Sequence, residues 1–184
     1  MRQKDSVKKN LVESILELEV KMFLRVPTGE EPSCRSDIES MKLHRSSQFA
    51  GWSVETCESY LDDLKKADQS GRNLLTLKYA RMDNQIPPLT NSTHLAAICN
   101  QYVEWQLEFI RQYPNIMRRG RSIDDFKNYL SSELETYSNK TLDLLWTDVE
   151  ACRHSGGNLS LDTYKYLAVQ AGFKSLEDME NNLS

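Results

Sequence analysis

The sequence has little of the residue types that build tight turns, metal centres and membrane spans. Only 7 glycines and 5 prolines occur among 184 residues, so few positions favour a break in a helix. The 3 histidines and 4 cysteines are scattered, without a CxxC pair or an HExxH motif, and we therefore expect no metal site. No apolar run approaches the roughly 20 residues of a membrane-spanning helix, and we expect no membrane partner.

The net charge and the positions of the cysteines bear on the partners and the cellular location of the protein. The formal net charge of −4 argues against a surface dedicated to nucleic acids. The sequence has no GxxxxGK or GxGxxG loop for phosphates, and we expect no cofactor. Three cysteines (Cys57, Cys99 and Cys152) fall on or near apolar faces of predicted helices, which is typical of free thiols in a reducing compartment. With no signal-peptide apolar core at the start, this pattern predicts a cytoplasmic protein.

Helical periodicity fills most of the sequence between the glycines and prolines. It predicts one all-α domain over residues 1–184, with about seven to nine helices. The predicted helices lie near residues 6–24, 36–49, 53–71, 74–82, 93–112, 122–137 and 141–153, followed by two short helices that begin at Ser160 and Ser175. We find no alternating strand pattern and no internal repeat.

The most informative feature is a set of polar side chains on helix faces that otherwise point to the core. At about 100° per residue, six of them fall inside apolar arcs. They are Glu19, Arg45, Lys78, Arg81, Gln106 and Glu133. A buried charge costs several kcal/mol unless it is paired, so such groups usually have partners. Their presence on five helices predicts one internal polar site.

The charges of this set indicate what the site could bind. Two carboxylates, Glu19 and Glu133, would face up to three cations, Arg45, Lys78 and Arg81. A surplus of buried cations favours an anion, because guanidinium groups hold carboxylates or phosphates in bidentate geometry. We therefore assign Arg45 and Arg81 to a small anionic substrate. We assign Glu19, Lys78 and Glu133 to proton transfer, since buried carboxylates and amines act as acids and bases.

Three further residues complete the candidate set. Tyr79 could donate a hydrogen bond to developing negative charge, as a catalytic residue. Gln106 lies at the centre of an apolar arc, and Arg118 precedes a predicted helix start where anions bind, so both are candidates for substrate binding. Tyr129 and Tyr137 offer additional hydroxyl groups. A structural salt-bridge network explains the same pattern without a ligand, as does a misjudged helix phase.

Several of these residues lie in strings that are similar to a known family. The strings His44-Arg45-Ser46-Ser47-Gln48-Phe49 and Lys78-Tyr79-Ala80-Arg81-Met82 resemble a bacterial family catalogued as domain of unknown function 4125. The match covers most of the chain and is densest over residues 10–85. The sequence has Asp83 where the family repeats a methionine. The resemblance implies a helical cytoplasmic protein, and some family members occur beside or fused to a nucleotidyltransferase-like domain.

These observations favour an enzyme. We predict a cofactor-independent lyase or hydrolase that uses general acid–base chemistry on a small carboxylate-bearing substrate such as an amino acid. The alternative is a helical accessory module for a nucleotidyltransferase-like partner, in which the internal charges are purely structural. The sequence does not predict an oligomeric state.

Overall fold

The computed structural model describes residues 2–27, 38–118 and 122–183, with side chains from residue 6 onward. These residues form helices and no strand, which confirms the predicted all-α class. The helices are α1 (Arg2–Phe23), α2 (Ile38–Gln48), α3 (Val54–Gln69), α4 (Leu74–Met82), α5 (Thr93–Gln112), α6 (Ile123–Leu134), α7 (Asn139–His154), α8 (Leu159–Gln170) and α9 (Leu176–Asn182). The predicted start near residue 36 lies outside the described residues. No described helix is both long and apolar enough to cross a membrane.

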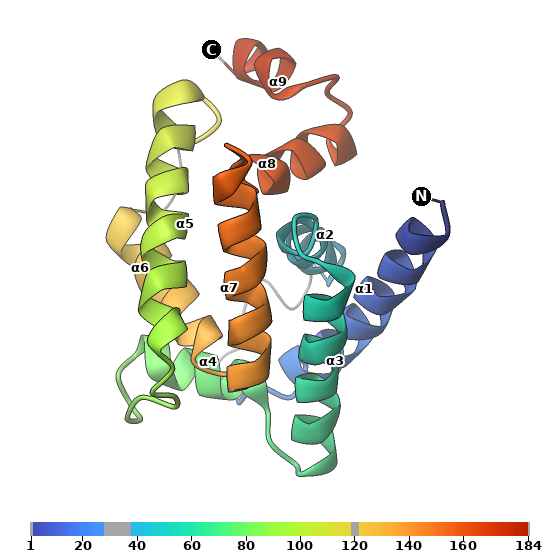
Figure 1. Ribbon diagram of the computed structural model, residues 1–184, viewed down its shortest axis with the longest axis vertical. Coiled ribbons are helices and arrows are strands. Elements are labelled where there is room, and N and C mark those ends of the chain that lie inside the picture. The colour runs from blue at the N-terminus through green and yellow to red at the C-terminus, as the bar shows by residue number, and fades with distance from the viewer. Residues whose placement is uncertain (1, 28–37, 119–121, 184) are drawn as a thin grey trace.

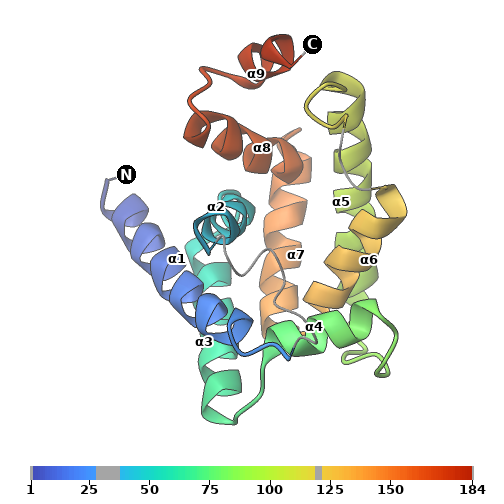
Figure 2. The same ribbon diagram turned by 180° about the vertical axis from the view of Figure 1, so that it is seen from behind.

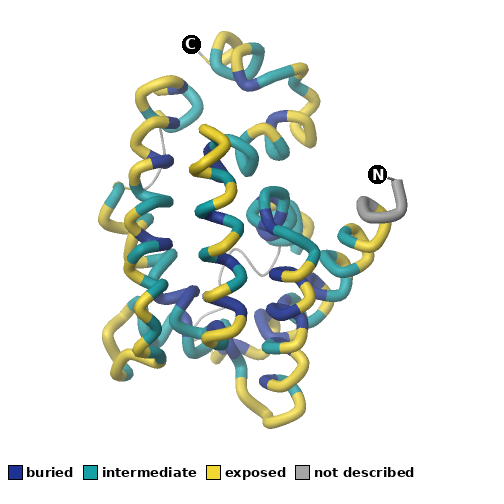
Figure 3. The backbone as a smooth tube through the Cα atoms, viewed as in Figure 1, coloured by how far each residue is buried: buried dark blue, intermediate teal, exposed yellow. Residues whose placement is uncertain are grey.

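Helix α3 and helix α7 form the centre of the molecule, where they lie side by side and run in opposite directions (Figures 1 and 2). Helix α1 packs on α3 from one side, and α5 packs on α7 from the other. The main core lies between them and includes the fully buried Ile15, Leu64, Ile98, Leu142 and Val149. Figure 3 shows the buried positions on the inward faces of these helices. A smaller core joins α5, α8 and α9 around Phe109.

Capping residues set the ends of α3 and α7. The side chains of Ser53 and Ser138 accept hydrogen bonds from backbone N–H groups three residues later, which would otherwise lack a partner. Gly71 and Gly156 follow the two helices with φ of +73° and +72°. This left-handed conformation favours glycine and ends a helix. The two central helices are therefore bounded by the same residue types at both ends.

The two halves of the chain repeat one arrangement, so the prediction of no internal repeat is wrong. Helices α1 to α4 correspond in order to α5 to α8. Helix α1 packs against α2, α3 and α4, and α5 packs against α6, α7 and α8. Across the halves, α4 contacts α6 just as α8 contacts α2. In Figure 1, a half-turn about the line of sight exchanges the two sets approximately, and α9 has no counterpart.

The register of this repeat is fixed by matched hydrogen bonds. The triplet Ser53, Thr56 and Asp63 recurs 85 residues later as Ser138, Thr141 and Asp148. The amide of Ser53 and the hydroxyl of Thr56 donate to Asp148 over 2.9 and 2.6 Å. The amide of Ser138 and the hydroxyl of Thr141 donate to Asp63 over 2.9 and 2.6 Å. Such reciprocal contacts are what a two-fold axis between α3 and α7 produces.

The outer helices α1 and α5 obey the same symmetry in a slightly different register. Asn73, which caps α4, donates to the carbonyl of Met22 over 2.7 Å. Asn158, which caps α8, donates to the carbonyl of Trp105 over 3.2 Å. The two carbonyls are 83 residues apart and the two asparagines 85. The stretch from the carbonyl to the capping asparagine is therefore two residues longer in the second half than in the first. The repeat leaves few identical residues in the sequence, among them Asn73-Leu74 and Asn158-Leu159.

Candidate functional site

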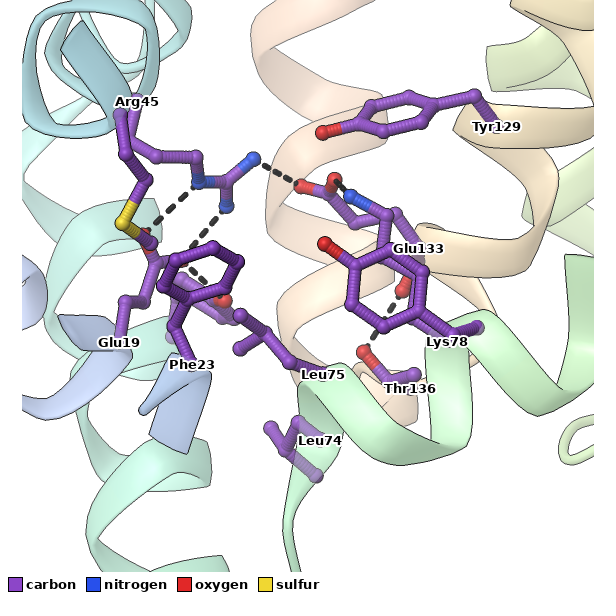
Figure 4. A pocket seen from close by; sticks show the side chains of 12 residues that line it. Glu19, Phe23, Arg45, Leu74, Leu75, Lys78, Tyr129, Glu133 and Thr136 are labelled. Atoms are coloured by element: carbon purple, nitrogen blue, oxygen red, sulfur yellow. Dashed lines mark hydrogen bonds and ion pairs between the residues drawn. The ribbon is translucent and has the colours of Figure 1, made fainter. Parts of the chain in front are cut away.

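Four of the predicted site residues meet in one buried ionic cluster. Glu19 comes from α1, Arg45 from α2, Lys78 from α4 and Glu133 from α6. Their exposed fractions are 1%, 7%, 7% and 6%, which confirms that the inward faces were correctly identified. Figure 4 shows Arg45 between the two carboxylates and Lys78 beside Glu133. The chemical roles assigned to these four side chains stay predictions.

The guanidinium group of Arg45 joins the two carboxylates. Its Nε and Nη2 atoms donate to the two oxygens of Glu19 over 2.8 and 2.6 Å. Its Nη1 atom donates to Oε1 of Glu133 over 2.7 Å and also contacts the side-chain oxygen of Gln48. Bidentate pairing fixes the plane of the guanidinium group as well as its position. Arg45 is thus held from three sides by groups on α1, α2 and α6.

Two buried tyrosines complete the coordination of the carboxylates. The hydroxyl of Tyr60 donates to Glu19 over 2.7 Å, and that of Tyr137 donates to Glu133 over 2.6 Å. Burial raises the pKa of both phenols well above the usual value, and the neighbouring carboxylates raise it further. Both tyrosines therefore stay neutral donors. Tyr60 was not among the predicted site residues. It lies on the apolar face of α3, where a buried tyrosine hydroxyl usually needs a hydrogen-bond partner.

Lys78 is the least constrained member of the ionic cluster. Its Nζ atom donates to Oε2 of Glu133 over 2.6 Å and lies 3.4 Å from the centroid of the Tyr129 ring. A lysine ammonium has three N–H groups. One is used by Glu133, and the ring face can receive a second through a cation–π contact. Among the described residues, the third has no recorded hydrogen-bond partner.

The charges of the ionic cluster balance, which corrects the predicted surplus of cations. Burial raises the pKa of Glu133, but the charges of Arg45 and Lys78 outweigh it and hold that pKa well below the usual value. Burial lowers the pKa of Arg45, yet Glu133 and Glu19 keep it well above the usual value. Both groups are therefore ionised near neutral pH. A carboxylate with so low a pKa is also a weak base.

A cavity of about 70 Å³ borders the ionic cluster and is partly open to solvent. Its lining comprises all four charged residues with Phe23, Met41, Tyr60, Leu74, Leu75, Tyr79, Tyr129 and Thr136. A water molecule needs roughly 10–15 Å³ on this scale, so the space corresponds to about five waters. The cavity is therefore large enough for a small organic molecule. The predicted catalytic residue Tyr79 lies in its wall.

Arg81 does not belong to this site. Its guanidinium group forms a bidentate pair with Glu135 over 2.6 and 3.1 Å and donates to the carbonyl of Ile86 over 2.7 Å. Lys78 and Arg81 are three residues apart on α4, so their side chains diverge by about 60° around the helix. Lys78 consequently reaches Glu133, whereas Arg81 reaches the next carboxylate beyond the end of α6. The prediction that Arg81 shares the polar site is wrong.

Gln106 and Arg118 also lie elsewhere. Gln106 is buried as predicted, but its amide donates to the hydroxyl of Tyr164 over 3.1 Å and contacts the sulfur of Met117, in the region where α5 meets α8. Arg118 is exposed beyond the C-terminal end of α5 and does not line the cavity. The prediction that these residues join the ionic cluster is wrong, because the inward faces of α1 and α5 lead to different places.

The histidines and cysteines in the described part of the chain form no metal centre. His94 lies 2.9 Å from Asp143 and is stacked on Trp146, at the surface. Within residues 6–27, 38–118 and 122–183, no three His, Cys, Asp or Glu side chains gather in a way that could hold a metal ion. The ionic cluster and its cavity are therefore the strongest candidate site in the described part of the chain.

Comparison with known proteins gives a family without an assigned activity. No curated protein and no solved structure matches this chain. A family model does match, over residues 9–181, and its description is "Protein of unknown function (DUF4125)". The match includes all four charged residues of the ionic cluster and both halves of the repeat. The chain belongs to the DUF4125 family.

Proposed function

We propose that the protein is a cytoplasmic enzyme that binds a small carboxylate-bearing molecule, such as an amino acid, in the cavity beside Lys78. Lys78 is the observation that carries this proposal, because it is a buried ammonium at a cavity wall with a single recorded hydrogen bond. Its remaining N–H groups can donate to a carboxylate oxygen. Phe23, Met41 and Leu75 offer an apolar surface for the rest of the ligand.

The proposed chemistry is general acid–base catalysis of the lyase or hydrolase type. In this proposal the ammonium group of Lys78 donates the proton or stabilises developing negative charge. Glu133 holds Lys78 in place through their hydrogen bond, and its own low pKa makes Glu133 a poor base. Glu19 and Arg45 are positioning residues, because their hydrogen bonds are directed at each other and at Glu133. Tyr79 is a further hydroxyl in the cavity wall.

Ligand-observed NMR with the common amino acids and short mono- and dicarboxylates tests the proposal. We expect at least one compound to bind the wild-type protein, and Lys78→Met to weaken that binding at least tenfold. Arg81→Met is the matched control, because it also removes a paired cation from α4 but lies outside the cavity. Reaction of the bound compound is then followed by proton NMR. Absence of binding by every compound, or equal binding by Lys78→Met, contradicts the proposal.

One observation favours a second candidate function. Each of the four buried charges is paired within the ionic cluster, as expected of a structural network in an accessory module. The partner would be a nucleotidyltransferase-like domain of the kind that accompanies some family members. Size-exclusion chromatography with light scattering, applied to this protein and a purified nucleotidyltransferase-like domain, alone and mixed, tests this candidate. A complex that forms equally well with Lys78→Met would support it. Elution of the two proteins as separate species would contradict it.

A further inference from the structure

Because the fold repeats, the ionic cluster can be compared with the equivalent positions in the other half of the chain. The cluster lies where α1, α2, α4 and α6 meet, and the repeat creates an equivalent junction of α5, α6, α8 and α2. The registers of 83 and 85 residues identify the four equivalent positions. Tyr102 corresponds to Glu19, Leu130 to Arg45, Thr163 to Lys78 and Gln48 to Glu133. None of these four residues carries a charge.

The four equivalent positions of the second junction hold uncharged side chains. Tyr102 and Leu130 pack against the main core, and the hydroxyl of Thr163 donates to the carbonyl of Leu159 on its own helix. Within the described residues, these four positions of the second junction therefore contribute no buried ion pair. Outside the junctions, the two halves share the serine caps, the reciprocal Asp contacts and the helix-ending glycines of α3 and α7.

We infer that the ionic cluster is a functional specialisation of one of two equivalent junctions, and that the fold does not require its charges. Burying two carboxylates and two cations is expensive, and apolar replacements of similar size often match or exceed the stability of such networks. The first junction has this free-energy cost and the second does not. The four charges of the first junction therefore serve a purpose other than packing. The chain then has one such site, formed by Glu19, Arg45, Lys78 and Glu133.

The same comparison separates site residues from architectural ones within the cavity wall. Tyr79 recurs as Tyr164, which stacks on Phe109 with ring centroids 3.9 Å apart and accepts a hydrogen bond from Gln106. A tyrosine at this position thus belongs to both halves. Lys78 has no cationic equivalent. Of the two neighbouring candidates on α4, the repeat therefore assigns Lys78 to the site and Tyr79 to the common fold.

The test converts the first junction into a copy of the second. The variant carries Glu19→Tyr, Arg45→Leu, Lys78→Thr and Glu133→Gln together, which leaves the total side-chain bulk nearly unchanged. A second variant removes the charges with closer shape mimics: Glu19→Gln, Arg45→Met, Lys78→Met and Glu133→Gln. Urea unfolding followed by circular dichroism gives the midpoint of each. Arg45→Leu alone serves as the comparison, since it leaves the buried carboxylate of Glu19 without the cation that pairs with it.

We expect at least one of the two fourfold variants to be helical, to unfold cooperatively, and to have a midpoint at or above that of the wild-type protein. The single Arg45→Leu variant should have a lower midpoint. If both fourfold variants fail to fold, or both unfold at lower urea than the wild-type protein, the charges are part of the architecture and the inference is overturned. This outcome is separate from ligand binding, because a stable fourfold variant would uphold the inference even if no carboxylate bound the wild-type protein.

Discussion

Replacement of Arg45 by methionine should destabilise the protein more than loss of any exposed ion pair. Among the residues that the structure describes, Arg45 alone pairs with Glu19 as a cation, and without it the carboxylate keeps the hydrogen bond from Tyr60. Glu133 would keep Lys78 and Tyr137. Removing one partner of a buried ion pair costs about 3–5 kcal/mol, because the other charge stays buried. For a protein of this size, that loss lowers the melting temperature by about 6–20 °C.

Urea unfolding at neutral pH, followed by tryptophan fluorescence, measures this loss. Arg25→Met is the control, since Arg25 pairs with Asp68 at the surface over 3.4 Å and such pairs contribute about 0–1 kcal/mol. The double variant Glu19→Gln/Arg45→Met should regain part of the stability lost by Arg45→Met, because the unpaired charge is gone. A loss below about 1 kcal/mol in Arg45→Met, or no recovery in the double variant, would refute the reasoning.

Three further predictions follow from other contacts. Tyr60→Phe removes the hydrogen bond to Glu19 and should cost about 1.5–3 kcal/mol in urea unfolding, since the acceptor is charged; an unchanged midpoint would contradict that role. Asp63→Ala and Asp148→Ala remove equivalent contacts and should lower the free energy of unfolding by similar amounts, about 1.5–3 kcal/mol each. A large difference between the two would argue against the two-fold relation. Because the pKa of Glu133 is below its unfolded value near 4.5, its contribution to stability is complete above that pH and is lost as the pH falls. Urea midpoints measured over the acid range should therefore fall less steeply for Glu133→Gln than for the wild-type protein.

The helices and their inward faces could be predicted because both depend on local sequence. The bounds of α4 and α5 agree with the prediction at both ends of each helix. Asn73 caps the N-terminus of α4, and Ser92 caps the N-terminus of α5. Helix phase depends on periodicity alone, so Glu19 and Glu133 were correctly placed in the interior. Local sequence cannot give the crossing angle of two helices, however. That angle decides that Lys78 reaches Glu133 and that Arg81 does not.

The sequence predicts that all the inward-facing polar residues meet in one site, and this prediction is wrong for Gln106. The two-fold arrangement of the helices explains why. In a symmetric fold, inward-facing positions on corresponding helices lead to two separate junctions. Gln106 on α5 therefore reaches Tyr164 on α8, just as Phe23 at the equivalent position of α1 reaches the wall of the ionic cavity. Periodicity identifies a buried face but not the junction it enters. The junction that a face enters depends on which helices pack together in three dimensions.

The reciprocal contacts between α3 and α7 also determine how the chain must fold. At the start of α3, the amide of Ser53 donates a hydrogen bond to Asp148 in the other half of the chain. At the start of α7, the amide of Ser138 donates to Asp63 in the first half. Docking of the two halves therefore completes the N-terminal hydrogen bonding of both central helices. The chain should therefore unfold in one cooperative step, and fragments separated in the linker between α4 and α5 should become more helical when they are mixed.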